Sequence, residues 1–408
     1  MSSFVKPLRF PPDIQKHFPP LTLSVREFLE VNLPPVAVVT TRAMRTQKYH
    51  SDLPPTSESV DEIMSLLSPP DDILATLQQS IRSGTVKSIQ CPHFQLETAS
   101  EQRYPLWIVS FWVQLAFVRK RQENWRKAIE KLKIQMERNQ NSSPLRKAFN
   151  SLAYVPWTGQ LQGVRDTIEV HELSLYFTRD WLTDDHELVM LSMLKKTIST
   201  EGNNCFVENT AFMTLLAAAY DKKDEYGTEH AYGWIRKRGE DLASCQKRYL
   251  ATVANQDNTH WVALIVDFES QELLYGDSFG HPISADMHAV IDWWTHYHTN
   301  SRFTVRTLPI SRQQDSFSCG MLAWDALRHR LASGAPNLMD PQQPFHERAD
   351  MFLQLTMAYH KDKVSQTSTY REVFYKCIFR ISNPTHHSPI QLIKVRHHHP
   401  HAVLRTNP

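Results

Sequence analysis

Residues 260–279 read HWVALIVDFESQELLYGDSF and carry the pattern of a β-hairpin. The run WVALIV is apolar and rich in β-branched residues, which is typical of a buried strand, and ELLYGD has a similar character. The polar DFESQ between the two runs provides a turn. With the turn centred between Phe268 and Glu269, the hairpin places His260 directly opposite Asp277.

The predicted pairing of His260 with Asp277 has a chemical consequence. Directly opposed residues of an antiparallel pair point to the same face, with Cβ atoms about 5 Å apart. That separation suits a hydrogen bond between an imidazole and a carboxylate. A slip of one residue would place the two side chains on opposite faces. The alternative interpretation is an ion pair at the end of a sheet with no catalytic role.

The stretch 313–320, QQDSFSCG, contains one of only five cysteines in the 408 residues. The periodic run GMLAWDALRHRLASG that follows predicts a helix beginning at Cys319 and ending near Gly334. A cysteine at a helix N-terminus has its thiolate favoured by the dipole, so we expect its pKa to be lowered. The alternative is an ordinary buried cysteine.

Gln313 lies six residues before Cys319. Its side-chain amide and the backbone N–H of the cysteine could converge on a developing oxyanion. Taken alone, a glutamine at this position is merely polar, and it gains meaning only beside a nucleophile and a base.

Together these residues resemble a known family. The pattern H-W…D-S…Q-x5-C-G, with Asp277 17 residues after His260 and Cys319 six residues after Gln313, is similar to the ubiquitin-like-protein-specific cysteine proteases, the clan of SUMO proteases and adenovirus protease. The segment DWLTDD at 180–185 resembles the family's W-L-N-D segment. One departure is Ser318, where many members carry Asp.

The resemblance implies a fold and a set of roles. The fold is α+β and papain-like, with a central mixed sheet flanked by helices. Cys319 would be the nucleophile, His260 the base, Asp277 the residue that orients the base, and Gln313 the oxyanion donor. Neither a cofactor nor a metal is implied.

The resemblance also implies a substrate. Trp181 and Trp261 would flank a narrow tunnel, and two flat rings leave a slot that fits residues without a Cβ. The expected reaction is therefore cleavage after the C-terminal Gly-Gly of a ubiquitin-like modifier of the SUMO type. Core packing is the alternative for both tryptophans. Two rival functions are an acyltransferase of the same clan, which would bind coenzyme A, and a non-catalytic protein that binds a modifier or tethers a partner.

The rest of the chain divides by composition. Residues 1–70 carry five Pro-Pro pairs and predict a partly disordered arm. We expect a helical region of unknown role at 71–150, with a polar linker at 138–151, then the catalytic domain at 165–385 and a His-rich disordered tail at 386–408. Within the catalytic domain the sequence predicts a strand at 303–310 and helices at 183–197, 207–220, 284–298, 319–333 and 345–361.

One helix is unusually basic. In 119–138, apolar residues recur at helical spacing at Trp125, Ile129, Leu132 and Met136, while the other faces carry eight basic and three acidic residues. A solvated helix with one face on the core is the favoured interpretation. A weak contact with nucleic acid or a protein partner is the alternative.

Charge and cysteine usage limit the classes of function. A net charge of +2 argues against a purely electrostatic partner. Five irregularly spaced cysteines are not a disulfide framework, so we expect a reducing compartment, nucleus or cytoplasm. The longest apolar run, 106–118, is too short to span a bilayer, and no membrane partner is expected.

Overall fold

A computed structural model describes residues 11–37, 49–82, 84, 86–90, 102–161, 167–200, 202, 204–334 and 336–366, and the predicted His-rich tail lies outside them. Its centre is a five-stranded mixed sheet in the order β3-β4-β5-β6-β7. The outer pairs, β3 with β4 and β6 with β7, are parallel, and the inner pairs are antiparallel. The strands are β3 (Cys205–Val207), β4 (Tyr249–Gln256), β5 (His260–Asp267), β6 (Glu272–Gly276) and β7 (Thr304–Thr307).

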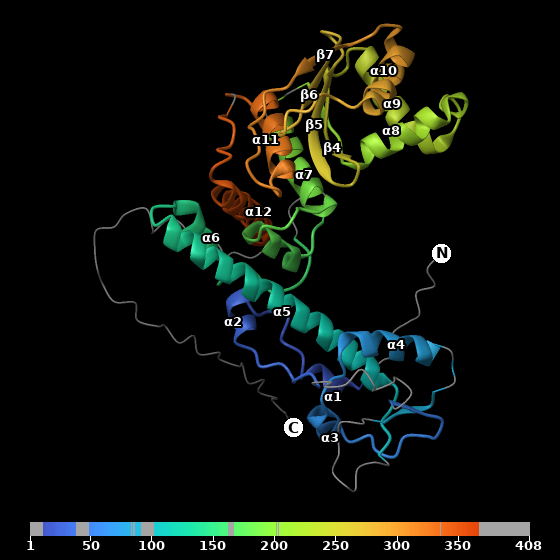
Figure 1. Ribbon diagram of the computed structural model, residues 1–408, viewed down its shortest axis with the longest axis vertical. Helices are drawn as coiled ribbons and strands as arrows, with labels where there is room; N and C mark the ends of the chain where they lie inside the picture. Colours follow the sequence, from blue (N-terminus) through green and yellow to red (C-terminus); the bar gives the residue numbers. More distant parts are fainter. Residues whose placement is uncertain are drawn as a thin grey trace, which may run out of the picture.

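Helices cover both faces of this sheet (Figure 1). Alternate residues of β5 separate the two cores: Trp261, Ala263 and Ile265 pack toward one side, and Val262 and Leu264 toward the other. The first side is covered by α7 (Asp184–Thr200) and α11 (Cys319–Leu331), with α12 (Pro344–Gln366) in the same core. The second is covered by α8 (Ala211–Asp221), α9 (Gly233–Ala243) and α10 (Ala285–Thr299). The predicted α+β architecture, a mixed sheet flanked by helices, is confirmed.

The five helices and the strand predicted for this region are all present, with ends shifted by up to a few residues. This region also contains the 3₁₀-helices η2 (Val170–Phe177), η3 (Lys223–Glu225) and η4 (His230–Tyr232). The sequence prediction did not include β4 or α9. β4 joins β5 through Asp257 and Asn258, whose φ angles of 54° and 56° are tolerated by residues of this type.

The predicted hairpin is present as β5 and β6, but its register is two residues away from the expected one. The pairs run from Ala263 opposite Gly276 to Asp267 opposite Glu272. The turn is centred one residue later than predicted, between Glu269 and Ser270, and the Asp267 side chain stabilises it by accepting hydrogen bonds from the backbone N–H groups of these two residues. A shift of two preserves the face, since side chains alternate with a period of two.

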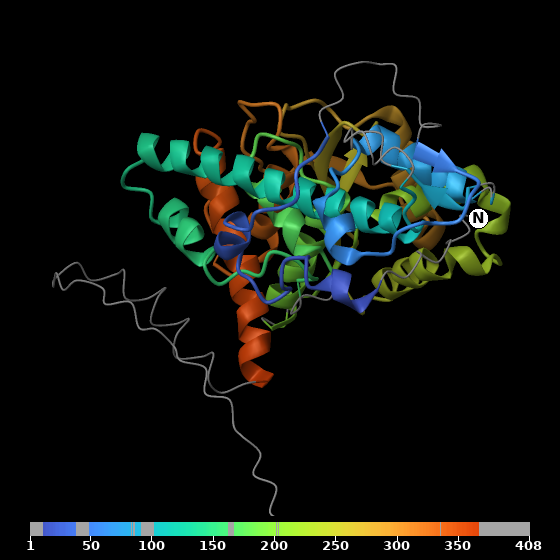
Figure 2. The same cartoon turned by 90° about the horizontal axis from the view of Figure 1, so that it is seen from below.

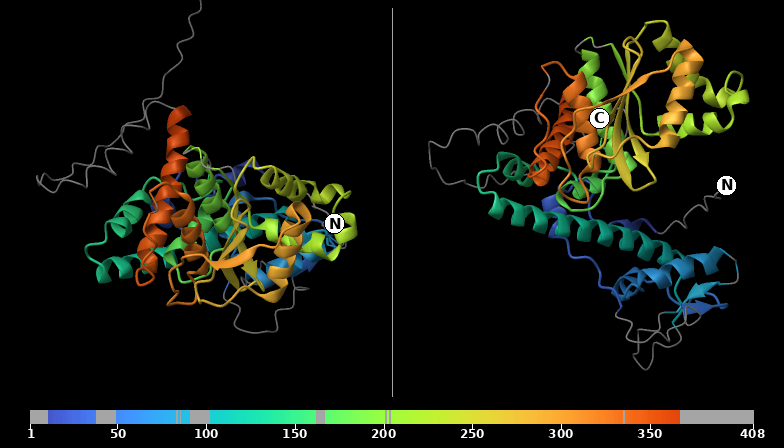
Figure 3. Two further views of the ribbon diagram at one scale, coloured as in Figure 1. Left: turned by 90° about the horizontal axis from the view of Figure 1, so that it is seen from above. Right: turned by 45° about the horizontal axis from the view of Figure 1, so that its top comes forward.

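The N-terminal part packs beneath this body (Figures 1 and 3). It has a small core of its own around Trp112 and Tyr104. Its elements are α1 (Pro12–Gln15), α2 (Val25–Leu29), β1 (His50–Ser51), α3 (Val60–Ser65), α4 (Asp71–Arg82), β2 (Ser88–Ile89), α5 (Trp107–Arg138) and α6 (Ser143–Ser151). The predicted domain boundaries stay predictions.

Helices α5 and α6 join the two parts into one core. Trp125 and Leu132 of α5 and Leu145 of α6 are buried in the cluster that also holds α7, α11 and α12. In Figure 2, α12 crosses the direction of α5, and it contacts α6. The linker predicted at 138–151 is therefore wrong, because Leu145 and Ala148 bury an apolar face of α6 that a linker would expose.

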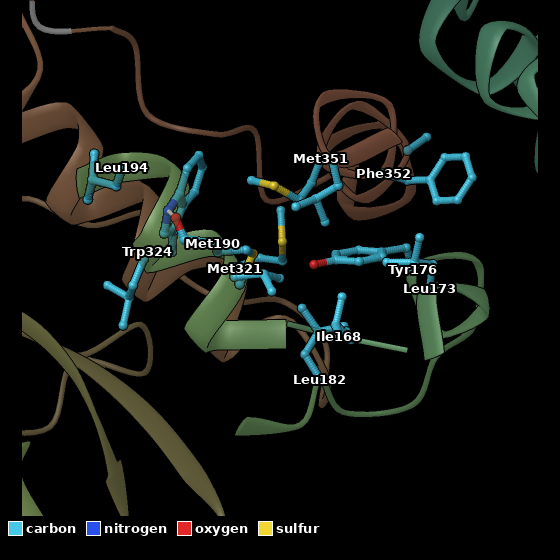
Figure 4. Close-up of a cluster of buried hydrophobic side chains, with 14 of the residues drawn as sticks. Ile168, Leu173, Tyr176, Leu182, Met190, Leu194, Met321, Trp324, Met351 and Phe352 are labelled. Atoms are coloured by element: carbon cyan, nitrogen blue, oxygen red, sulfur yellow. Dashed lines mark hydrogen bonds between the residues drawn. The ribbon is translucent and has the colours of Figure 1, made fainter. Parts of the chain in front are cut away.

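Figure 4 shows the middle of this shared core, where Met190 of α7, Met321 of α11 and Met351 of α12 meet. Tyr176 of η2 points its hydroxyl into the same cluster. Within the described part of the chain, no helix is both long and apolar enough to cross a membrane.

Candidate functional site

His260 and Asp277 meet at the open end of the hairpin. His260 is the first residue of β5, and Asp277 directly follows β6. Their side chains join through Nε2 of the imidazole and Oδ1 of the carboxylate, 3.1 Å apart. Because of the two-residue change in register, the two residues meet diagonally rather than directly across the hairpin.

The Asp277 carboxylate is almost fully buried and well supplied with donors. Oδ1 also accepts hydrogen bonds from the backbone N–H groups of Phe279 at 2.7 Å and Gly280 at 3.2 Å. Oδ2 accepts one from the hydroxyl of Tyr275 at 3.3 Å, and Nδ1 of the exposed His281 lies 3.6 Å away. Such donors hold a buried carboxylate in place and in one orientation. Phe279 covers the base as well, with its ring stacked on His260 at 4.8 Å between centroids.

Cys319 is the first residue of α11, as the sequence predicts, and only 4 % of its surface is exposed. Its sulfur receives hydrogen bonds from the backbone at Trp261, the residue after His260, and at Gly320, and these act to lower the thiol pKa. Burial is the larger effect and raises the pKa of the thiol above its usual value. The expected lowering of the thiol pKa is therefore wrong, because desolvation of the sulfur outweighs the effect of the helix N-terminus.

Gln313 is held by two partners. Its Oε1 accepts a hydrogen bond from the hydroxyl of Ser278, and its Nε2 donates to the backbone carbonyl of Asp315, both at 2.8 Å. The Asp315 carboxylate in turn accepts from the backbone N–H groups of Phe317 and Ser318. The amide is thus tied to the loop that leads into Cys319, and its oxyanion role stays a prediction.

The two predicted tunnel residues differ in exposure. Trp181 has 51 % of its surface exposed, and its indole N–H donates to the backbone carbonyl of Ser316 in the loop before Cys319. Trp261 is 5 % exposed and packs against the start of α11, within 3.3 Å of the position that a Cβ on Gly320 would take. Trp181 therefore borders the site at the surface, while Trp261 supports it from beneath.

Sequence reasoning missed Arg348 of α12. This guanidinium is fully buried and donates four hydrogen bonds to backbone carbonyls. Nη1 binds those of Leu175 and Thr178, and Nη2 binds those of Asp180 and Phe317, at 2.8–3.1 Å. Arg348 thereby fastens the segment before Trp181 to the loop before Cys319. No short sequence pattern predicts a contact between residues so far apart in the chain.

Sequence reasoning also missed Glu187, a fully buried carboxyl in the first turn of α7. A signal was present, since Glu187 lies three, four and seven residues before Met190, Leu191 and Leu194, on the apolar face of the helix. Burial raises the pKa of Glu187 to about 8.

A groove of about 390 Å³ lies on the same helix, farther from its start. It is bordered by α7, the end of β3 and α9, and Lys195, Glu208, Trp234 and Arg238 are among its lining residues. Among the described residues there is no group of three or more His, Cys, Asp or Glu side chains that could hold a metal ion.

Residues 180–351 match the sequence model of the Ulp1 protease family, C-terminal catalytic domain. This segment runs from the residue before Trp181 to the first turns of α12, and it includes all six predicted site residues. A cysteine-peptidase catalytic domain of papain-like fold is therefore present. No sequence among the curated proteins matches the chain.

Solved structures with similar folds have low sequence identity. The yeast Ulp1 protease domain in complex with Smt3, the yeast ortholog of SUMO, is 18 % identical, with 54 % of this chain and 96 % of that chain covered and a TM-score of 0.41. A Ulp1-like SUMO protease domain from Chaetomium thermophilum is 13 % identical, with 45 % and 78 % covered and a TM-score of 0.35. The Xanthomonas campestris effector XopD bound to ubiquitin is 19 % identical, with 43 % and 91 % covered and a TM-score of 0.30.

Proposed function

Because residues 180–351 belong to the Ulp1 protease family, we propose that the protein is a peptidase or isopeptidase that cleaves after the C-terminal Gly-Gly of a ubiquitin-like modifier. One observation carries the proposal beyond the family match. His260 and Asp277 are joined by a 3.1 Å hydrogen bond, and the backbone of Trp261, the residue after His260, is hydrogen-bonded to the Cys319 sulfur.

The hydrogen bond defines the state of the base. Asp277 accepts a hydrogen bond from the N–H at Nε2, so Nδ1 is the basic nitrogen that takes the proton of Cys319. The thiolate attacks the carbonyl carbon of the terminal glycine, and the imidazolium then protonates the leaving amine. His260 then takes a proton from a water molecule that attacks the thioester carbonyl. The C–S bond breaks, the imidazolium returns its proton to the Cys319 sulfur, and the carboxylic acid product leaves.

The raised pKa of the Cys319 thiol determines its protonation state before the reaction. Burial keeps Cys319 neutral until His260 accepts its proton, so the reactive thiolate forms together with the imidazolium. The backbone N–H of Cys319, at the start of α11, is one donor to the oxyanion, and we assign the Gln313 amide as the second. Gln313 would exchange its bond to the Asp315 carbonyl for one to the oxyanion.

For the substrate we propose a modifier of the SUMO type. Trp181 supports a modifier that ends in Gly-Gly, because it is a half-exposed ring fixed to the loop before the nucleophile, where a glycine-only tail would pass. We assign the groove on α7 as a contact surface for the folded body of the modifier. Its lining includes Lys195, Trp234 and Arg238, of which Arg238 is already paired with Glu208.

Vinyl-sulfone derivatives of SUMO and ubiquitin test the proposal directly. We expect a stable adduct with the SUMO probe on the wild-type protein, none on Cys319→Ala, and an unchanged adduct on Cys245→Ser, which removes an exposed thiol elsewhere. If a Cys319-dependent adduct formed with the ubiquitin probe alone, the peptidase proposal would stand and ubiquitin would replace SUMO as the proposed modifier. If neither probe forms one, the peptidase proposal fails.

The two rival functions have separate outcomes. An acyltransferase would take an acetyl group from acetyl-coenzyme A onto Cys319, which intact-mass measurement detects. A non-catalytic binder would retain the SUMO probe non-covalently and equally in wild type and Cys319→Ala. Either result, with no covalent adduct, would replace the peptidase proposal.

The basic helix and the cellular compartment are proposals of a second rank. On α5, Trp125, Ile129 and Leu132 face the core, as predicted, and exposed bases such as Lys127 face solvent. Lys127 is already paired with Glu123, so any nucleic-acid contact here would be weak and salt-sensitive. The described cysteines are all unpaired, which supports a reducing compartment, nucleus or cytoplasm. A salt-dependent gel shift and a fluorescent fusion test the two points.

A further inference from the structure

Glu187 lies directly beneath the residue that follows the candidate nucleophile. A Cβ built on Gly320 would come within 1.9 Å of its Oε1 and 2.9 Å of its carboxyl carbon. The carboxyl therefore fills the space that any other residue at position 320 would need. It is fully buried, and neither of its oxygens has a hydrogen-bond partner among the described residues.

Titratable or charged groups from three other elements interact with this carboxyl. The thiol of Cys319 comes from α11, the phenol of Tyr176 from η2 and the guanidinium of Arg348 from α12. Asp184 acts on it from its own helix. Tyr176 and Arg348 are buried as completely as Glu187 itself, so water screens their interactions very little.

Two of these groups interact with Cys319 in opposite senses. A negative charge on Glu187 disfavours the thiolate, and the positive charge of Arg348 favours it. With Glu187 neutral, the charge of Arg348 is uncompensated and supports ionisation of the thiol. With Glu187 ionised, the two buried charges largely cancel and the support is lost.

We propose that Glu187 is a positioning residue of the catalytic site that must be protonated for Cys319 to ionise. The carboxyl holds the start of α11 by packing against Gly320, and its charge state sets how readily the sulfur becomes a nucleophile. The inference rests on Cys319 being the nucleophile of the proposed function. Because burial raises the pKa of Glu187 to about 8, the change of state falls just above neutral pH.

Alkylation of Cys319 by iodoacetamide, followed by mass spectrometry of the Cys319 peptide, tests this without any peptidase substrate. Reactivity follows the thiolate fraction. Glu187→Gln has nearly the same shape and cannot ionise. We expect its rate to agree with wild type within about twofold at pH 6.5 and to exceed it at least about tenfold at pH 9, where wild-type Glu187 is charged. A ratio that is the same at both pH values overturns the proposal.

A control variant and the pH profile of the wild-type protein provide two further checks on the proposal. Asp185→Asn removes one exposed charge two residues away on the same helix and should follow the wild-type profile at both pH values. If Glu187→Gln does not fold, Glu187→Leu takes its place. In the wild type alone, the rate should rise less than tenfold per pH unit above about pH 8. A wild-type curve with a single simple titration contradicts the proposal, whether or not a modifier probe reacts.

Discussion

The Ser278 hydroxyl donates a 2.8 Å hydrogen bond to Oε1 of Gln313, and the backbone N–H of Gln313 donates a 2.9 Å bond to the Ser278 carbonyl. Ser278 directly follows Asp277, so this pair of bonds joins the turn that holds the acid to the loop that holds the amide. Gln313, the proposed oxyanion donor, and Asp277, which orients the base, therefore keep a fixed relative position.

From this relationship we expect Ser278→Ala to impair catalysis without removing any reacting group. The amide would lose one of its two tethers and would spend less time in position. Loss of an oxyanion donor costs about 10²- to 10³-fold in kcat, and a loosened donor should cost about three- to tenfold. Single-turnover cleavage of a modifier–fluorophore fusion measures this. Ser244→Ala, which removes a hydroxyl at the end of α9, is the control. Equal rates in the two variants would mean that the bond does not position Gln313.

Phe279 provides a second prediction. Its ring stacks on His260 at 24° between planes while 48 % of its surface stays exposed. Since such stacking is worth about 0.5–1.5 kcal/mol, Phe279→Ala should let the imidazole rotate and lower kcat roughly two- to tenfold. Phe279→Tyr should retain most of the rate.

The matched control is Phe117→Ala, which removes an exposed phenylalanine of α5 outside the site. Steady-state kinetics across pH 6–9 distinguishes the cases. If Phe279→Ala raised KM and left kcat unchanged, the ring would contact the substrate and would not orient the base.

Much of the geometry of the candidate site was predictable because its signals are local. The hairpin pattern brings His260 and Asp277 to one face, and an error of two residues in register leaves that face unchanged. The helix that begins at Cys319 follows from the periodicity of the residues after it. Both inferences need only neighbouring residues and the period of the element.

The parts that could not be predicted depend on distant contacts. Arg348 reaches carbonyls up to 173 positions away in sequence, and no short pattern encodes that. The thiol pKa depends on how deeply α11 is buried, which the helix dipole alone does not report. α6 resembles a polar linker until α12 covers Leu145. In each case tertiary packing overrides a correct local observation.

Arg348 yields a prediction about stability. Arg348→Met would remove a donor from four carbonyls, three of them in the segment before Trp181. The Leu175 carbonyl would still accept from Thr178, and the other three would lose the Arg348 donor. Buried groups left unsatisfied cost about 1–3 kcal/mol each before relaxation, so the free energy of unfolding should fall by about 3 kcal/mol or more. Arg348→Lys keeps the charge but cannot reach all four carbonyls and should be intermediate.

Urea unfolding followed by tryptophan fluorescence measures the effect of these changes. The control is Arg302→Met, which removes an exposed arginine between α10 and β7. If Arg348→Met matched the control, the four hydrogen bonds would carry little net stability.

Glu187 makes stability depend on pH, with a sign that follows from its burial. The folded state keeps the carboxyl proton up to about pH 8, whereas the unfolded chain releases it near the ordinary value of 4.5. Between these values the folded state binds one more proton, so rising pH favours unfolding. The contribution is about 1.4 kcal/mol per pH unit. It is fully present below pH 4.5 and is lost as pH rises through 8.

Glu187→Gln should therefore gain stability relative to wild type as pH rises from 5 to 8. Urea unfolding of both proteins at pH 5, 6, 7 and 8 gives the difference at each pH, and changes in other groups cancel in that difference. Asp185→Asn, on the exposed side of the same turn, should show no such trend. Parallel curves for wild type and Glu187→Gln would mean that Glu187 is ionised in the folded protein at neutral pH, and the role assigned to its neutral form would then be wrong.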